Sequence, residues 1–262
     1  MDIDNLFVRY HDTQSKGNPV LLLHGLGGSI ESWLKNISAI SAEELRVIVL
    51  DLPGFGLSDK PKINYTIDFY TIFIAKFIKS LKIDSCLSIV GCSLGGQIAA
   101  EIAIKYPTLS SKLVLISPAG APPYSFKGTY ALRKYIGVTR AKSVQEVKEA
   151  LSVVDNNNNI IINNNYAQDF YHKLSTPGAK EAFISALKGS ADASRLSKRL
   201  DRIQANTLLI WGKNDQIIPV KYIEPFIKMK NCRIILIENS GHVPFINKPQ
   251  LFNKIVTDFI KE

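Results

Sequence analysis

The sequence has few cysteines and no long hydrophobic run. Its three cysteines are scattered over 262 residues, and none is spaced from another as zinc ligands or redox dithiols are. This usage fits a reducing, intracellular setting. No window approaches the roughly 18 consecutive apolar residues that are needed to cross a bilayer, and no basic segment followed by an apolar stretch opens the chain. These absences predict a soluble, cytoplasmic protein without a membrane span.

Acidic residues are fewer than basic ones, but the excess charge is not clustered. The chain has 32 Lys and Arg residues against 23 Asp and Glu residues, a net charge of +9, which raises the question of nucleic-acid binding. The densest basic stretches, SKRLDRIQ and LRKYIGVTRAK, are broken by apolar residues at helical spacing, and neither has the pattern of interleaved aromatic residues that single-strand binding uses. The dispersed basic residues therefore predict charged helix faces that are exposed to solvent, and we expect no nucleic acid as a partner.

Short apolar runs alternate with helical patterns along the chain. Each run has four to six residues, mostly Val, Ile and Leu without polar alternation, as in parallel strands covered on both faces. The runs lie at 20–25, 46–51, 86–91, 112–117, 207–212 and 233–238. Helical spacing of apolar residues in 66–81 and 251–259 supplies crossover and closing helices. The chain therefore predicts an α/β protein.

One interval breaks this alternation. Residues 118–202 contain several helical patterns and no convincing buried strand, so we expect a helical insertion between core segments 1–117 and 203–262. Within the insertion, DNNNNIIINNNY is a low-complexity patch whose asparagines favour turns and helix caps. We expect it to be a loop between helices.

The stretch Gly91-Cys92-Ser93-Leu94-Gly95 matches the pattern G-x-S-x-G. It follows a predicted strand and precedes a predicted helix, which is the context that makes the pattern meaningful. A strand that turns sharply into a helix holds its serine in strained geometry and requires glycines beside it. Ser93 is therefore the candidate nucleophile, although by itself the pattern also fits a serine that caps a helix.

A serine nucleophile needs a histidine base and an acid that orients the histidine. His242, in NSGHVPF, follows the last predicted strand through a short loop. Asp215 follows the strand at 207–212, and it is the preferred acid. Glu238 is the rival acid, and a turn or capping role is the alternative for Asp215. The predicted catalytic residues are Ser93, Asp215 and His242.

Backbone amides should stabilise the negative oxygen that forms when Ser93 attacks a carbonyl. The amide of Leu94 lies at the start of the predicted helix, and that of Leu26 lies in LLLHGLGGS, at the end of another predicted strand. His24, in the same segment, has no histidine or carboxylate at ligand spacing. We expect it to brace the loop, and we expect neither a metal nor a cofactor.

Five ordered motifs carry a resemblance to a known family. They are His24-Gly25, DLPGFGLSDKP from Asp51, the turn GCSLGG, Asp215 in WGKNDQIIP and His242 in SGHVPF. Together they resemble the α/β-hydrolase superfamily nearly from end to end. The resemblance implies the α/β-hydrolase fold, which is a mostly parallel eight-stranded sheet flanked by helices with a helical cap inserted after the sixth strand.

The residues around the nucleophile narrow the branch of the superfamily. Epoxide hydrolases and dehalogenases use aspartate where this chain has Ser93. Cys92 is one residue too early to match the cysteine of dienelactone hydrolases, and we expect it to be buried and to point away from the pocket. The cap segment resembles that of meta-cleavage product hydrolases and related carboxylesterases. The carbon–carbon hydrolases of this group typically have asparagine before the nucleophile, where this chain has Cys92. The resemblance therefore favours hydrolysis of carboxylic esters.

The expected partner is a small-molecule ester or a related carbonyl compound, bound by a monomer or homodimer. Alternatives are a carbon–carbon bond hydrolase of the meta-cleavage product type and a small-ligand receptor with low turnover on the same fold. The aromatic residues of the cap suggest an apolar pocket but equally fit packing of helix on helix. The residues predicted to line the pocket are Gly25, Trp33, Tyr124, Phe126, Tyr130, Phe170, Phe183 and Val243.

Overall fold

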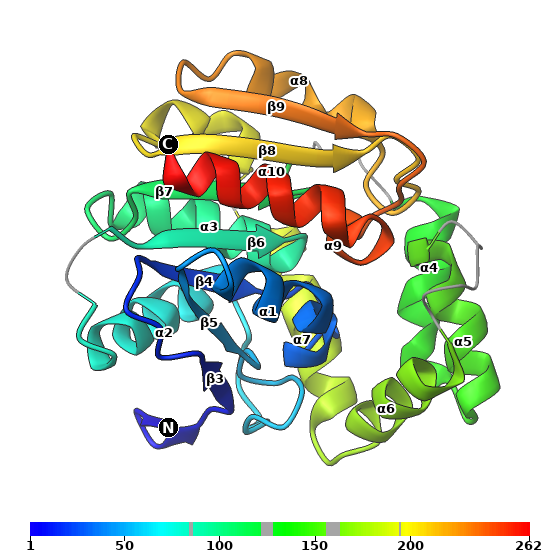
Figure 1. The fold of residues 1–262 in the computed structure, drawn as a ribbon. Coiled ribbons are helices and arrows are strands. Elements are labelled where there is room, and N and C mark those ends of the chain that lie inside the picture. The colour runs from blue at the N-terminus through cyan, green and yellow to red at the C-terminus, as the bar shows by residue number, and fades with distance from the viewer. Residues whose placement is uncertain (84–85, 122–127, 156–162, 194) are drawn as a thin grey trace.

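A seven-stranded sheet forms the centre of the protein (Figure 1). The computed structural model describes residues 1–83, 86–121, 128–155, 163–193 and 195–262. Within these residues the strand order is β3-β5-β4-β6-β7-β8-β9, with β3 antiparallel to β5 and the other neighbours parallel. The strands span Tyr10–Asp12 (β3), Pro19–Leu23 (β4), Arg46–Leu50 (β5), Ser88–Cys92 (β6), Lys112–Ile116 (β7), Asn206–Gly212 (β8) and Cys232–Ile237 (β9).

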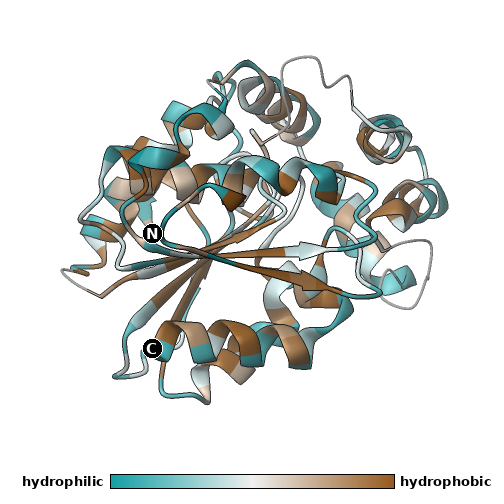
Figure 2. Cartoon of the chain, turned by 90° about the horizontal axis from the view of Figure 1, so that it is seen from above, coloured by the Kyte–Doolittle hydropathy of each residue, from teal (hydrophilic) through white to brown (hydrophobic). Residues whose placement is uncertain are grey.

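Helices cover both faces of this sheet, and Figure 2 shows the apolar strands between them. The side chains of β4 alternate, so that Leu21 and Leu23 join one apolar cluster and Val20 and Leu22 the other. The first cluster includes residues of α2 and α3, and the second includes residues of α1 and α10. Burial on both faces explains why the strands are continuous apolar runs. These helices, with the short α8 and α9, span Leu34–Ser41 (α1), Ile67–Ser80 (α2), Leu94–Lys105 (α3), Glu224–Ile227 (α8), Pro244–Asn247 (α9) and Pro249–Lys261 (α10).

Further helices lie between β7 and β8, where the sequence predicts the insertion. They span Tyr130–Ile136 (α4), Val144–Leu151 (α5), Asn164–Leu174 (α6) and Ala179–Asp192 (α7). Figure 1 shows α4, α5 and α6 beyond the carboxyl ends of the strands. Most of the asparagine-rich patch, residues 156–162, lies outside the described residues. Short 3-10 helices span Ile30–Trp33 (η1), Gly137–Arg140 (η2), Ser152–Asp155 (η3), Leu196–Lys198 (η4), Leu200–Arg202 (η5) and Val220–Ile223 (η6).

The main sheet of the described residues has seven strands, one fewer than the eight that the family resemblance implies. At the start of the chain, β1 (Asp2–Ile3) and β2 (Leu6–Phe7) pair only with each other within the described residues. Asp4 and Asn5 between them have positive φ angles of 53° and 62°, so the chain reverses tightly there and the strands remain short. The insertion therefore follows β7, which is the fifth strand of the main sheet in chain order and not the sixth.

The described helices carry no candidate for a membrane crossing, since none combines sufficient length with sufficient apolar character. The predicted boundaries of individual strands are close to those found. The largest shifts are in β4 and β6. β4 starts one residue earlier and ends two residues earlier than the run at 20–25, and β6 starts two residues later and ends one residue later than the run at 86–91.

Candidate active site

Ser93 lies on the sharp turn between β6 and α3. Its backbone has φ 54° and ψ −114°, a conformation that is strained for any residue other than glycine. The surrounding backbone holds it there, because its N–H donates to the carbonyl of Ile116 at 2.9 Å. Its own carbonyl accepts the N–H groups of Gln97 at 3.0 Å and Ala119 at 2.9 Å. The turn therefore presents the Ser93 side chain at the carboxyl edge of the sheet.

Gly95 allows the start of α3 to approach the end of β4. A Cβ atom at this position would lie 2.4 Å from the carbonyl oxygen of Leu23 and 2.5 Å from that of His24. These distances are too short for any side chain to be accommodated. The helix therefore packs directly against the strand whose following loop carries Leu26. This contact brings the two predicted oxyanion amides to one place.

Asp215 orients His242. Its Oδ2 lies 2.8 Å from Nδ1 of His242, and its Oδ1 accepts the N–H groups of Ile217 and Ile218, both at 2.9 Å. The side chains of Asp215 and His242 are 0% and 8% exposed. Because Nδ1 is held by the carboxylate, Nε2 is the ring nitrogen that can take a proton from a nucleophile. Glu238, the rival acid, is 67% exposed and pairs with Lys213.

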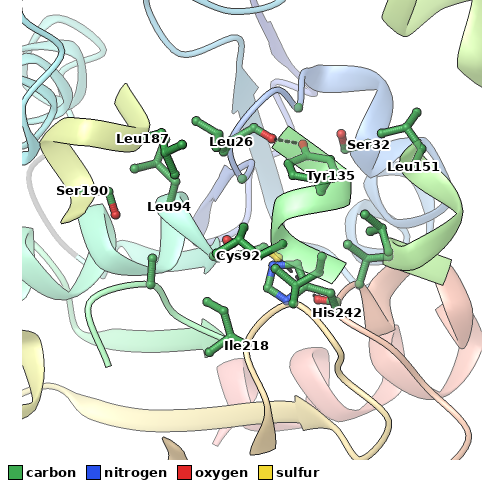
Figure 3. A pocket seen from close by; sticks show the side chains of 18 of the residues that line it. Leu26, Ser32, Cys92, Leu94, Tyr135, Leu151, Leu187, Ser190, Ile218 and His242 are labelled. Atoms are coloured by element: carbon green, nitrogen blue, oxygen red, sulfur yellow. Dashed lines mark hydrogen bonds between the residues drawn. The ribbon is translucent and has the colours of Figure 1, made fainter. Parts of the chain in front are cut away.

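Ser93 and His242 line one cavity of about 310 Å³ that lies between the sheet edge and the helices α4 to α7 (Figure 3). Leu26 and Leu94, the predicted oxyanion residues, also line it. The N–H of Leu94 belongs to the first turn of α3, where an amide has no acceptor within its own helix. Most of the remaining wall is apolar. It includes Leu132, Leu151, Val154, Leu187, Ile217, Ile218, Phe245 and Ile246.

His24 braces the loop after β4 and is not placed as a base. Its Nδ1 lies 2.8 Å from the carbonyl of Gly25, and its Nε2 accepts the N–H of Leu52 at 2.9 Å. Nδ1 is therefore the protonated nitrogen in this arrangement. Complete burial lowers the pKa of His24, more strongly than the nearby carboxylate of Asp51 raises it. The imidazole is thus neutral and fully engaged by backbone groups.

Five of the eight predicted pocket residues lie in or directly behind the wall of the cavity. Gly25, Phe170 and Val243 line the cavity. Trp33 and Phe183 are fully buried but are not part of the wall. Trp33 stacks on Phe245 with ring centroids 4.1 Å apart, and Phe183 packs 5.9 Å from Tyr135. These two aromatic side chains therefore support the wall from behind.

Tyr130 was expected in the pocket, but it is 74% exposed and does not line the cavity. It opens α4, and the residues of that helix that reach the cavity are Leu132 and Tyr135. Positions two and five residues further along a helix lie on the opposite side from the first, which explains the error. Tyr124 and Phe126 lie outside the described residues.

Cys92 is buried as expected, but the prediction that it points away from the pocket is wrong. It lines the cavity, and its Sγ lies 3.9 Å from the carbonyl oxygen of His242. Burial, together with the nearby charge of Asp215, raises the pKa of the Cys92 thiol well above its ordinary value. The thiol therefore stays protonated and forms part of the cavity wall.

Sequence reasoning missed two tyrosines of the insertion, Tyr135 and Tyr166, which both line the cavity. Burial raises the pKa of each phenol above its ordinary value, so both are neutral hydrogen-bonding groups. The three-residue spacing of Leu132 and Tyr135 marks one face of α4 and was the available signal. Which neighbour that face meets depends on tertiary packing.

Residues 18–249 match the model of a protein family described as the alpha/beta hydrolase fold. The chain belongs to this family. The match confirms the α/β-hydrolase fold that the motifs imply, and the mostly parallel sheet flanked by helices agrees with it. As an α/β hydrolase, the chain can be compared with relatives that are named by their reactions.

Two relatives and one solved structure illustrate the range of reactions among the proteins that this chain resembles. The chain is 28% identical over 252 residues to a 2-hydroxy-6-oxo-6-(2'-aminophenyl)hexa-2,4-dienoic acid hydrolase of Metapseudomonas resinovorans, covering 94% of this chain and 84% of that one. It is 27% identical to human monoacylglycerol lipase ABHD6, covering 92% and 74%. The structure of a meta-cleavage product hydrolase from Pseudomonas fluorescens IP01 superimposes with a TM-score of 0.87 and 26% identity, covering 98% and 95%. This α/β hydrolase thus resembles both carbon–carbon and ester hydrolases.

Proposed function

We propose that this α/β hydrolase is a serine hydrolase that cleaves carboxylic esters of small molecules through an acyl-enzyme. One observation carries the proposal. His242, hydrogen-bonded to Asp215, lines the same cavity as Ser93, which lies on a strained turn beside helix amides. This combination is what nucleophilic catalysis by a serine requires.

In the first half of the reaction, Ser93 Oγ attacks the ester carbonyl while Nε2 of His242 takes the hydroxyl proton. The amides of Leu26 and Leu94 stabilise the negative oxygen of the tetrahedral intermediate, and one such donor contributes roughly 3 kcal/mol. Asp215 stabilises the imidazolium through Nδ1. The intermediate then collapses, and the alcohol leaves with the proton from His242.

In the second half, His242 takes a proton from water, and the resulting hydroxide attacks the acyl carbon. The carboxylic acid leaves as Ser93 recovers its proton from the imidazolium. The sum is ester plus water giving acid plus alcohol, so neither a metal nor a redox cofactor is required. The apolar wall of the cavity suits an apolar acyl or alcohol group.

Cys92 favours ester cleavage over carbon–carbon cleavage. In meta-cleavage product hydrolases an asparagine amide stands at the position before the nucleophile, as the family resemblance indicates. Here the corresponding side chain is a thiol directed at the carbonyl oxygen of His242, which offers a substrate no comparable donor and acceptor.

Arg195 favours the second candidate, hydrolysis of a carbon–carbon bond in a vinylogous diketone that carries a carboxylate. Its side chain lines the cavity and also donates to the carbonyl of Ala191 at 2.7 Å. A guanidinium in the wall is a suitable partner for the carboxylate of an acidic substrate. The named relatives include hydrolases of this type.

A substrate panel on wild type and Ser93→Ala tests the proposal. We expect wild type to hydrolyse p-nitrophenyl esters of short and medium acyl chains, and Ser93→Ala to lose this activity. A lactone and a vinylogous diketone complete the panel. Cleavage of the diketone with negligible ester turnover would support the second candidate, and negligible turnover of every compound would indicate a ligand receptor on the same fold.

A further inference from the structure

Tyr135, on α4, forms a hydrogen bond with the loop that carries a predicted oxyanion amide. Its hydroxyl donates to the carbonyl oxygen of Leu26, as the dashed line in Figure 3 shows. The bond joins residues 109 positions apart and connects the helical insertion to the core. Burial raises the pKa of Tyr135, so the phenol keeps its proton and remains a donor at neutral pH.

The core holds this loop at its beginning and again at its far end, where the N–H of Ile30 donates to Oδ1 of Asp51 at 2.7 Å. The carbonyl of Gly25 accepts the Nδ1–H of His24 at 2.8 Å and the N–H of Gly28 at 3.0 Å. Gly27 has φ 71°, and glycine passes between positive and negative φ with little steric cost. The carbonyl of Leu26, immediately before this permissive residue, is held from the insertion by Tyr135.

Aromatic side chains of the insertion also enclose Gly27. A Cβ atom there would lie 2.8 Å from Phe183, 3.0 Å from Phe170 and 3.0 Å from the hydroxyl oxygen of Tyr135. The loop therefore fits into a slot formed by α4, α6 and α7. With these side chains withdrawn, the backbone around Gly27 gains room to rotate.

A second tether holds the far end of the same loop. The Nζ of Lys173, on α6, lies 3.2 Å from the Ser29 hydroxyl and forms an ion pair with Glu31. Lys173 is only 9% exposed, so solvent screens this pair weakly. The insertion thus holds the loop at two points, on either side of Gly27.

We propose that Tyr135 is a positioning residue for the oxyanion hole. By holding the carbonyl of Leu26, it fixes the peptide plane that follows this residue, while the bonds to the carbonyl of Gly25 fix the plane that contains the Leu26 N–H. Together these bonds limit rotation about Leu26 and keep its N–H directed into the cavity. Closure of the insertion over the sheet and assembly of the oxyanion hole are then one event. This inference rests on the proposed function, because that proposal assigns the amide of Leu26 to the oxyanion.

Tyr135→Phe tests the inference, with Tyr171→Phe as the matched control. Tyr171 also lies in the insertion, and its hydroxyl donates to the carbonyl of Lys142 at 3.0 Å, a bond that does not reach the core. We expect Tyr135→Phe to lower kcat about tenfold, because the Leu26 amide that it positions then donates a weaker hydrogen bond to the oxyanion of the transition state. KM should change less than about twofold, because this amide acts on the oxyanion more than on the bound substrate.

A transition-state analogue separates positioning from general loosening. An alkyl boronic acid, which forms a tetrahedral adduct with a serine nucleophile, should bind Tyr135→Phe about tenfold more weakly and Tyr171→Phe as tightly as wild type. Unchanged kcat and boronate affinity in Tyr135→Phe, with active wild type, would overturn the inference and leave the proposed function intact. An equal loss in both variants would also overturn it.

Amide hydrogen exchange of the segment 24–30 gives a readout that requires no activity. We expect exchange of this peptide to be at least several-fold faster in Tyr135→Phe than in wild type, and unchanged in Tyr171→Phe. Faster exchange would support the tether even if wild type hydrolysed none of the esters, a result that would contradict only the proposed function. Equal exchange in wild type and Tyr135→Phe would overturn the inference whatever the activity.

Discussion

Asp215 and His242 are brought together by the register of two neighbouring strands. Gly212 at the end of β8 pairs with Ile237 at the end of β9, so the loops that follow leave the sheet side by side. The N–H of Asn214 donates to the carbonyl of Ser240 at 3.0 Å and continues the pairing beyond the strands. The 2.8 Å bond between Oδ2 and Nδ1 therefore follows from sheet geometry.

Replacement of Asp215 by Asn should remove most of the activity without unfolding the protein. The amide keeps the size of the carboxylate but cannot stabilise an imidazolium, and it favours the wrong tautomer of His242. We expect kcat for a p-nitrophenyl ester to fall roughly 1,000-fold or more. The control is Glu238→Gln, which changes the exposed rival acid and should keep wild-type kcat. A larger loss in the control than in Asp215→Asn would reverse the assignment of the acid.

Gly95→Ala should destabilise the protein through a backbone clash. The added Cβ would lie 2.4 Å from the carbonyl oxygen of Leu23, and neither β4 nor α3 can move without repacking the core. We expect the free energy of unfolding to fall by about 2 kcal/mol or more in urea denaturation. Gly137→Ala is the control, because nothing lies within 4 Å of a Cβ there. Equal stability of the two variants would contradict this packing.

The Glu31 carboxylate should make stability depend on pH. Although burial acts to raise it, hydrogen bonds from Arg9, Lys173 and Ser29 lower the pKa of Glu31 to about 2, from 4.5. A lowered pKa contributes stability that is complete above pH 4.5 and is lost as the pH falls through about 2. We expect Glu31→Gln to cost roughly 2 kcal/mol at neutral pH, after a discount for partial exposure.

The difference in free energy of unfolding between wild type and Glu31→Gln should shrink progressively between pH 4.5 and 2, as measured by urea denaturation. The control is Glu262→Gln, which removes an exposed pair with Arg233 and should leave the urea midpoint unchanged. A difference for Glu31→Gln that stays constant down to pH 2 would contradict the lowered pKa.

The cysteines should differ in reactivity towards an alkylating reagent. Burial raises the pKa of the Cys92 thiol, so little thiolate forms and the reagent has poor access. Cys86 is exposed. We expect iodoacetamide at pH 8 to label Cys86 in the native protein, and Cys92 only after unfolding, as measured by mass spectrometry of the peptides. Native labelling of Cys92 together with loss of activity would argue that its sulfur is accessible in the cavity.

Ser93 could be predicted with its surroundings because local sequence encodes the turn. The glycines around it, the apolar run before it and the helical pattern after it all lie within a few residues, where steric constraints act directly. The same local logic located six strands of the sheet. The count of eight came from the family resemblance, and the main sheet of the described residues has seven strands, because β1 and β2 pair only with each other across a tight reversal at Asp4 and Asn5.

The walls of the cavity were predicted less well. Gly25, Phe170 and Val243 line it, whereas Tyr130 is exposed and Trp33 and Phe183 pack behind the wall. Aromatic composition shows that a segment buries apolar surface but not which surface it meets, because the hydrophobic effect has no direction.

By itself, the sequence determined the α/β architecture, the family and the order of Ser93, Asp215 and His242, because strand patterns and turn glycines act locally. Only the tertiary structure decided that Tyr135 reaches the carbonyl of Leu26 and that Cys92 lines the cavity. Both depend on how an inserted group of helices sits on the sheet edge. That placement results from contacts between residues far apart in the chain, and no local pattern encodes it.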